Sequence, residues 1–145
     1  MKRGFTQSTQ EVQDLLRAHG ISPTRQRVAL GCLLFARPDH FTAEDLYIRA
    51  REAGIRVSKA TVYNTLGTFT ERGLLREVVV DSSAKFYDSN LEPHQHLYNV
   101  DTGELTDLDS EQVQIEALPD LPAGARIEGV DVIIRYRGRK ESAAH

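Results

Sequence analysis

The residues best suited to chemistry in this sequence are histidines and aspartates that could bind one metal ion. His94 and His96 are two residues apart, so their imidazoles lie on the same side of an extended segment. Asp107 follows a tight-turn signal and lies on the strand predicted to pair with the one that His96 begins, which returns it to the two histidines. Asp88 lies shortly upstream, and His40 would come from the first half of the chain. These five residues form a candidate metal site.

The ligand types indicate which ion such a site prefers. Three imidazoles and two carboxylates without a thiolate favour Mn(II) or Fe(II) in an open geometry, and Zn(II) would also bind in vitro. Cys32 is the only cysteine, which excludes intramolecular disulfides and cysteine-based zinc sites. Two alternatives remain open at this point. The cluster is either a set of unrelated surface residues or the centre of a small metal-dependent hydrolase with Glu92 or Asp101 as general base.

A second group of polar residues lies on a helix predicted to start at Ser58. Residues 58–66 place small and hydrogen-bonding side chains at the amino-terminal end, which is where a recognition helix enters the DNA major groove. Asn64 could pair with adenine, and Tyr63 could lie against a thymine methyl group. A solvated amphipathic helix and a winged helix that binds protein without DNA are the alternatives. The predicted DNA-binding residues are Arg25, Ser58, Lys59, Thr61, Tyr63 and Asn64.

The first half of the chain is predicted to form a winged helix-turn-helix over residues 1–90. Apolar residues at helical spacing, with Thr24, Thr42 and Ser58 as caps, predict four helices, and alternating residues then predict a strand hairpin. Asp45 completes a capping box with Thr42. The helices are expected at about 12–19, 24–35, 42–54 and 58–73, and the strands at 75–80 and 85–87.

The second half is predicted to be a small αβ dimerisation and sensing domain at residues 91–137, which makes the fold class α+β. Strands at 96–100 and 104–108 flank the turn Asp101-Thr102-Gly103. We expect Ser110 to cap a short helix, and residues 138–145 to be a flexible tail. The core would be thin, which favours pairing with a second copy. The helix would contain Val113, Ile115 and Leu118, and a strand at 127–136 would have Val130, Val132 and Ile134 on one face.

The charge distribution fits a first half that binds a polyanion and a second half that binds metal or protein. The chain has 145 residues, of which 40% are hydrophobic and 27% charged, and its net charge of −3 divides into +3 for residues 1–90 and −6 for residues 91–145. No apolar run approaches the ~20 residues of a membrane span. No signal peptide is recognisable at the amino terminus. We therefore expect a soluble, cytoplasmic protein without a membrane partner.

These motifs together resemble the ferric uptake regulator (Fur) superfamily of metal-dependent transcription factors, from about Ile21 to Arg137. The most specific pieces are Pro-Thr-Arg-Gln-Arg at 23–27, Thr-Ala-Glu-Asp-Leu-Tyr at 42–47, Ala-Thr-Val-Tyr at 60–63, and His-x-His at 94–96 followed by Thr-Gly-Glu-Leu-Thr-Asp at 102–107. Within the superfamily, residues 24–31, 60–66 and 129–135 are most similar to the iron response regulator (Irr) branch.

The resemblance implies a non-enzymatic homodimer, or a higher oligomer, that binds double-stranded A/T-rich promoter DNA. It implies that the same five histidines and aspartates hold the regulatory ion. The superfamily's structural zinc site uses a Cys-x-x-Cys pair at positions that here are Asn99 and Thr102, so this site is absent. A further metal site of some relatives is lost at Pro93 and Gln95.

The Irr branch implies that haem is the signal. Haem would bind at His94 and His96, in a Pro-His-Gln-His segment, and a haem-delivering protein would then be a partner. A peroxide sensor of the same superfamily is the alternative. In such a sensor, Fe(II) at the same site drives oxidation of a ligand histidine.

Overall fold

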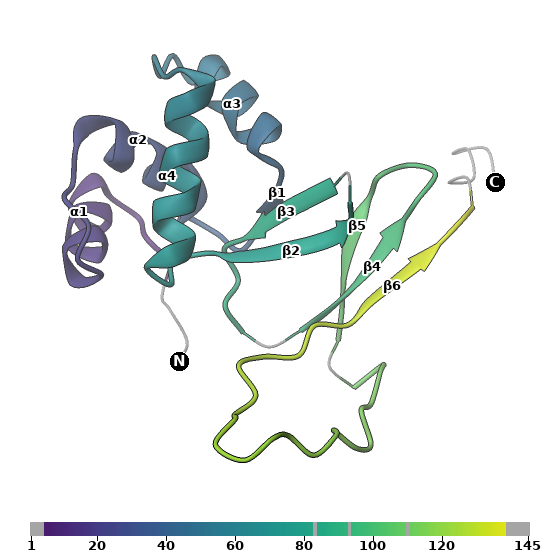
Figure 1. Cartoon of the computed structure of the whole chain (residues 1–145). Helices are drawn as coiled ribbons and strands as arrows, with labels where there is room; N and C mark the ends of the chain where they lie inside the picture. Colours follow the sequence, from purple (N-terminus) through teal and green to yellow (C-terminus); the bar gives the residue numbers. More distant parts are fainter. Residues whose placement is uncertain (1–4, 83, 93, 110, 139–145) are drawn as a thin grey trace. The chain divides into compact units, whose positions relative to one another are not determined.

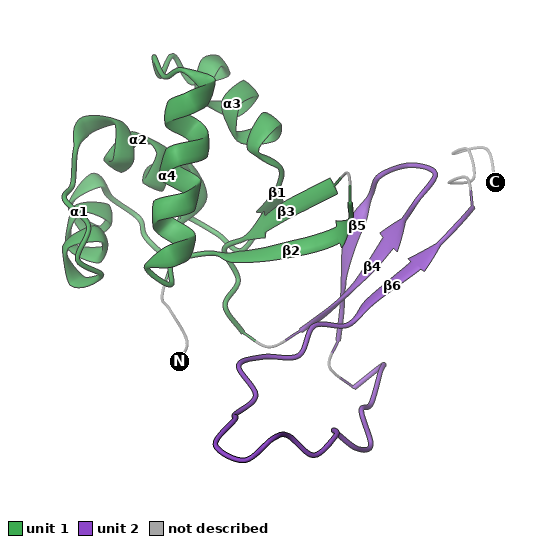
Figure 2. Ribbon diagram, in the orientation of Figure 1, with its two compact units in different colours: residues 1–92 green, residues 93–145 purple. Residues whose placement is uncertain are grey.

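The chain forms two compact units, Met1–Glu92 and Pro93–His145 (Figure 2). The structure is a computed structural model that describes residues 5–82, 84–92, 94–109 and 111–138. The predictions made for Pro93, for Ser110 as a helix cap and for residues 139–145 of the tail therefore lie outside the described residues. Each unit has its own sheet, and each is described separately below.

The first unit consists of four helices and a three-stranded sheet (Figure 1). Its elements are α1 (Thr9–Ala18), α2 (Arg25–Leu34), β1 (His40–Phe41), α3 (Ala43–Glu52), α4 (Lys59–Glu71), β2 (Arg76–Asp81) and β3 (Ala84–Asp88). The four predicted helices and the predicted hairpin are confirmed. None of the helices in the described ranges has the length and apolar character needed to cross a membrane.

Local caps explain where the helices begin. The side chains of Thr24 and Ser58 accept hydrogen bonds from backbone N–H groups three residues further on, as predicted. Thr42 and Asp45 form the predicted capping box, with Asp45 N–H donating to Thr42 Oγ1 at 3.1 Å and Thr42 N–H donating to Asp45 Oδ2 at 2.9 Å. These bonds satisfy backbone donors that the first helical turn leaves without partners.

The core of the first unit lies between its helices. Leu16 of α1, Leu34 of α2 and Leu46 of α3 are fully or almost fully buried, and α4 adds the three residues predicted to face inward. The rings of Phe35 and Phe69 pack with centroids 5.3 Å apart. Because this core holds one face of α4, the opposite face is left for a partner. The inward residues of α4 are Val62, Leu66 and Phe69.

The sheet of the first unit contains a strand that the sequence pattern did not predict. Its strand order is β1-β3-β2, and β3 pairs antiparallel with both neighbours. β1 has only two residues, which is too short for alternation to be visible. Near the tip of the β2–β3 hairpin, Lys85 Nζ lies 2.8 Å from Glu77 Oε1, and this hydrogen bond raises the pKa of Lys85 above its usual value.

The second unit is a three-stranded sheet with strand order β5-β4-β6. β4 (Gln95–Asn99) and β5 (Leu105–Leu108) form the predicted antiparallel hairpin, and β6 (Ile133–Tyr136) pairs with β4 in parallel. Gly103 closes the hairpin turn at φ 76°, in the left-handed region that glycine adopts without strain.

Two predictions for the second unit are wrong. Residues 111–118 do not form the predicted helix, and the predicted strand at 127–136 is reduced to its last four residues. Ile115 and Leu118 are exposed, because the small sheet offers them no surface to pack against, and so short a helix is marginal without packing. β6 is short because its partner β4 has only five residues. In the described part of the second unit, the α+β class is therefore represented by strands alone.

A buried amide joins the hairpin turn to the segment that follows β6. Asn99 is 3% exposed, and its side chain donates to the backbone oxygen of Gly138 at 2.7 Å. Its Oδ1 accepts hydrogen bonds from the N–H groups of Asp101, at 2.9 Å, and Thr102, at 3.2 Å. Arg137 and Asp101 add an ion pair of 3.2 Å. Hydrogen bonds of Asn99 thus hold the turn between β4 and β5.

Asn99→Ala is expected to destabilise the second unit by about 1–3 kcal/mol, because it removes three hydrogen bonds from the side chain of a buried residue, to Asp101, Thr102 and Gly138. Thermal unfolding should show a lower midpoint, and hydrogen exchange should show faster exchange at Asp101 and Thr102. Asn64→Ala, a change at an exposed asparagine of α4, is the matched control. Equal stability of the two variants would contradict the role of Asn99.

Candidate metal centre and nucleic-acid interface

His96 and Asp107 are brought together by strand register. They are directly paired across β4 and β5, so their side chains lie on the same face of the sheet. His94 precedes β4 by one residue, and its ring lies 4.5 Å from that of His96, measured between centroids. The period-two spacing and the hairpin together produce this cluster, as the sequence predicted.

The three side chains converge on one point. Nε2 of His94 lies 3.6 Å and Nε2 of His96 lies 3.5 Å from the same carboxylate oxygen, Oδ1 of Asp107. Two ligand atoms that each lie about 2.1 Å from a shared ion are about 3–3.4 Å apart. The observed distances exceed this range only slightly, so the three residues fit a divalent ion. Two imidazoles and a carboxylate are donors that Mn(II), Fe(II) and Zn(II) all accept.

The other two predicted ligands are neighbours in the first unit. His40 of β1 is the register partner of Asp88 at the end of β3. Ser89 fixes the two strand ends, because its backbone N–H donates to the oxygen of Asp39 at 2.9 Å and its Oγ accepts from the N–H of Asp39 at 3.0 Å. Asp88 Oδ1 accepts a hydrogen bond from the N–H of Asn90 at 2.9 Å. Each unit therefore assembles its own group of ligands, and their joint use is a matter of proposal.

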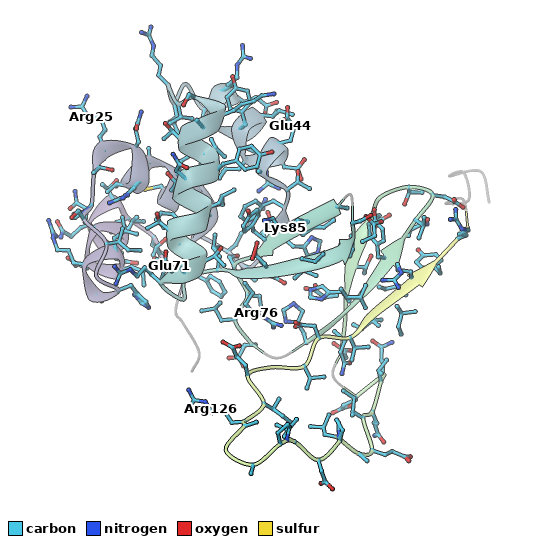
Figure 3. All side chains as sticks on the ribbon, in the orientation of Figure 1. Arg25, Glu44, Glu71, Arg76, Lys85 and Arg126 are labelled. Carbon is cyan, nitrogen blue, oxygen red and sulfur yellow. The ribbon has the colours of Figure 1, made fainter. Side chains whose placement is uncertain are left out.

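The predicted recognition helix α4 presents an exposed polar face. Tyr63 is 54% exposed and Asn64 is also exposed, on the side opposite the buried Val62 and Phe69. A helix in the major groove reads bases with side chains that point away from its own core. Tyr63 and Asn64 have that position. Arg25, the first residue of α2, is exposed as well (Figure 3).

Three of the predicted DNA-binding residues already have partners within the protein. Ser58 Oγ accepts from the N–H of Thr61 at 3.0 Å, and the two hydroxyl groups lie 3.0 Å apart, so both side chains support the start of α4. Lys59 Nζ lies 3.5 Å from Oε2 of Glu44, and both side chains are largely exposed. Exposed ion pairs contribute little stability, so Lys59 can exchange Glu44 for a phosphate.

Comparison with known proteins decides the family. Residues 18–132 match the sequence profile of the Ferric uptake regulator family. The chain belongs to this family. It is 32% identical over 104 residues to the peroxide-responsive repressor PerR of Staphylococcus aureus (strain Mu50), a match that covers 71% of this chain and 70% of the repressor.

Solved structures agree with this assignment. The ferric uptake regulator from Pseudomonas aeruginosa with manganese is 28% identical and has a TM-score of 0.66, and the match covers 89% of this chain and 98% of that one. The Campylobacter jejuni peroxide stress regulator shares the fold, with 21% identity, a TM-score of 0.58 and coverage of 94% and 99%.

Membership of the ferric uptake regulator family answers several predictions. Proteins of this family are transcription regulators that bind DNA and form dimers, so the enzyme alternative and the alternative without DNA contact are both wrong. The α+β fold class with an amino-terminal DNA-binding domain is confirmed. The matches include iron-linked and peroxide-linked regulators, and they establish the family without establishing the Irr branch.

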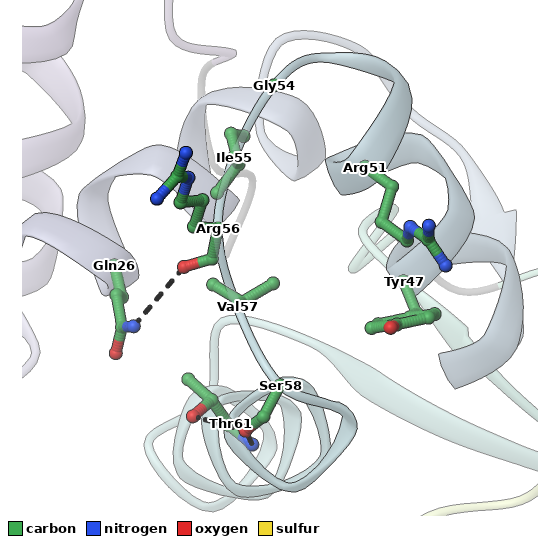
Figure 4. A pocket seen from close by; sticks show the side chains of 9 residues that line it. All are labelled: Gln26, Tyr47, Arg51, Gly54, Ile55, Arg56, Val57, Ser58 and Thr61. Carbon is green, nitrogen blue, oxygen red and sulfur yellow. Dashed lines mark hydrogen bonds between the residues drawn. The ribbon is translucent and has the colours of Figure 1, made fainter.

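A groove beside α4 adds residues that the sequence analysis did not select. It has a volume of about 760 Å³ and lies at the amino-terminal end of the helix (Figure 4). A smaller hollow of about 260 Å³ lies between the start of α2 and α4 and includes Asn64. The sequence does contain one signal for this groove, because Arg51 follows Tyr47 by four residues and the two side chains therefore lie on the same face of a predicted helix. The larger groove is lined by Gln26, Tyr47, Arg51, Gly54, Ile55, Arg56, Val57, Ser58 and Thr61.

Proposed function

We propose that this member of the ferric uptake regulator family is a dimeric, iron-responsive transcriptional regulator that binds A/T-rich promoter sites. A divalent ion, Fe(II) or Mn(II), controls its affinity for DNA. The observation that carries the proposal is the convergence of His94 and His96 on one oxygen of Asp107. This arrangement brings together one anionic and two neutral donors, which suits a divalent cation.

The proposed site also includes His40 and Asp88. The ion would accept electron pairs from all five side chains and would thereby link the two units. His40 and Asp88 lie on β1 and β3 of the first unit, whereas the other three ligands lie on or beside β4 and β5 of the second unit. Ligand binding shifts a conformational equilibrium only through unequal affinity for the two states. We propose that the state in which all five ligands meet is the one that places two copies of α4 one DNA turn apart, ~34 Å.

The second copy is proposed to bind through the second unit. Large apolar side chains are exposed along this unit and on its edge strand β6. A second copy would cover them. A regulator of promoters acts where the chromosome is, so we place the protein in the cytoplasm. The exposed apolar residues of this unit are Ile115, Leu118, Leu121, Ile127, Val130, Ile134 and Tyr136.

Two signals remain to be distinguished. In the Irr-type proposal, haem takes His94 and His96 from the ion and releases DNA, and a haem-delivering protein is then a partner. In the second candidate, peroxide oxidises a ligand histidine, as would suit a chain that is 32% identical to a peroxide-responsive repressor. Both signals act through the same ligands, and they differ in what happens to the histidines.

A titration on fluorescent A/T-rich duplex separates the signals. Anisotropy and the Soret band are followed together while haem is added to the Mn(II)- or Fe(II)-loaded dimer. Release of DNA with a stoichiometric histidine-ligated haem spectrum supports the haem signal. Loose haem binding with DNA retained, together with one added oxygen on His40 or His94 after peroxide treatment of the Fe(II) form, supports the peroxide signal. DNA binding that needs no metal at all would contradict both.

A further inference from the structure

Three arginines of the first unit, at the start of α2, on α3 and in the segment before α4, have no carboxylate partner in the described part of the chain. Arg25, Arg51 and Arg56 are exposed, and no ion pair joins any of them to a described acidic residue. Lys59 at the start of α4 differs, because it is paired with Glu44. Arg51 and Arg56 therefore supply positive charge beside the groove that no described carboxylate neutralises.

Arg51 and Arg56 lie on opposite sides of the segment that leads into α4. Figure 4 shows Arg51 projecting from α3 above the ring of Tyr47, while Arg56 projects toward α2. The guanidinium carbon of Arg51 lies 5.7 Å from the centre of the Tyr47 ring. Gln26 of α2 donates a hydrogen bond to the backbone oxygen of Arg56 at 3.4 Å. Both arginines are thus attached to fixed elements at the mouth of the groove.

We propose that Arg51 and Arg56 bind phosphate groups of the two DNA strands that border the major groove occupied by α4. This inference rests on the proposed function. The major groove is about 12 Å wide, so a helix that enters it by its first turn brings residues on either side of that turn to the two backbones. Phosphate contacts of this kind fix the register of the protein and carry no base preference. Tyr47 is a positioning residue, which holds Arg51 by contact between the cation and the ring.

Glu44 is a negative charge on the same surface, and it is expected to oppose DNA binding. It lies on α3 beside Lys59 and is largely exposed, so it opposes the approach of a phosphate and occupies a cation that could bind one. The surface therefore predicts effects of opposite sign. Removal of Arg51 or Arg56 weakens DNA binding, and removal of the Glu44 charge strengthens it.

The test is the salt dependence of duplex binding by the full-length, Mn(II)-loaded protein. Arg51→Gln and Arg56→Gln should each reduce the slope of log K against log salt by about 0.9 for every chain bound, equally for an A/T-rich operator and a random duplex. Arg17→Gln, an exposed arginine of α1 that is paired with Asp14, is the matched control and should leave the slope unchanged. Circular dichroism verifies that each variant is folded.

Two further variants test the details. Glu44→Gln should raise the affinity for both duplexes. Tyr47→Leu should weaken DNA binding although no charge is lost. Tyr47→Phe should bind DNA like the wild type, because the ring is kept. Wild-type slopes in both arginine variants, with operator specificity still lost in Tyr63→Ala, would overturn this inference and leave the proposed function standing. Absence of salt-dependent DNA binding in the wild type would overturn both.

Discussion

Asp107→Asn is expected to lower the affinity of the protein for Mn(II) at least about 100-fold. Substitution of residues that only hydrogen-bond to a metal ligand already lowers metal affinity by about 10- to 100-fold, and Asp107 would be a ligand itself. Nε2 of His94 and Nε2 of His96 both lie close to Oδ1 of Asp107, at 3.6 and 3.5 Å. The amide keeps the shape of the side chain and removes its charge. Since the Asp107 side chain is 47% exposed, the substitution should leave the fold intact.

Isothermal titration with Mn(II) measures the effect. His96→Ala should show a loss of the same order, and His19→Ala serves as control, because this histidine lies on α1, where its Nδ1 is hydrogen-bonded to the backbone oxygen of Leu15. Retention of wild-type Mn(II) affinity by Asp107→Asn would exclude this cluster as the regulatory site.

In the same variant, addition of metal should no longer change the affinity for DNA. Metal and DNA affinities are linked reciprocally, so a protein that cannot bind the ion gains nothing from its addition. Anisotropy on the operator duplex should show a metal-dependent rise in affinity for the wild type and none for Asp107→Asn. If the variant still responds to Mn(II), the ion acts elsewhere in the protein.

Asn64→Ala is expected to weaken operator binding about 5- to 150-fold per chain, which corresponds to the 1–3 kcal/mol of a bidentate contact with a base. Asn64 lies on the exposed face of α4, and its amide could make two hydrogen bonds with adenine. Tyr63→Ala should also weaken operator binding, because it removes the exposed ring that would contact a thymine methyl group. Neither change removes a cation, so affinity for a random duplex should be preserved.

Competition between operator and random duplex measures this loss of specificity. Glu71→Gln is a suitable control, because Glu71 lies on the same helix at the end opposite to Lys59 (Figure 3). Equal losses on the two duplexes would show that Asn64 contributes to general affinity and does not read sequence. Unchanged operator affinity in both variants would show that α4 is not the reading helix.

Sequence alone determined the elements whose signals are local. Thr24, Thr42 and Ser58 cap their helices through bonds that span three residues, so the sequence contains the whole interaction. The hairpin closed by Gly103 is local in the same sense, since a tight turn sets the register of the strands beside it. His96 and Asp107 lie in that register, and His94 lies two residues before His96, which is why these three of the five candidate ligands could be predicted from local patterns.

Only the tertiary structure decided the rest. His40 meets Asp88 through a two-residue strand whose partner lies far along the chain, and no local pattern reports such a pairing. The groove between Arg51 and Arg56 depends on how α2 and α3 pack around α4. Residues 111–118 carry helical spacing and yet form no helix, because an amphipathic segment becomes a helix only where a surface is available to cover its apolar face. Spacing is a property of the chain, and that surface is a property of the folded protein.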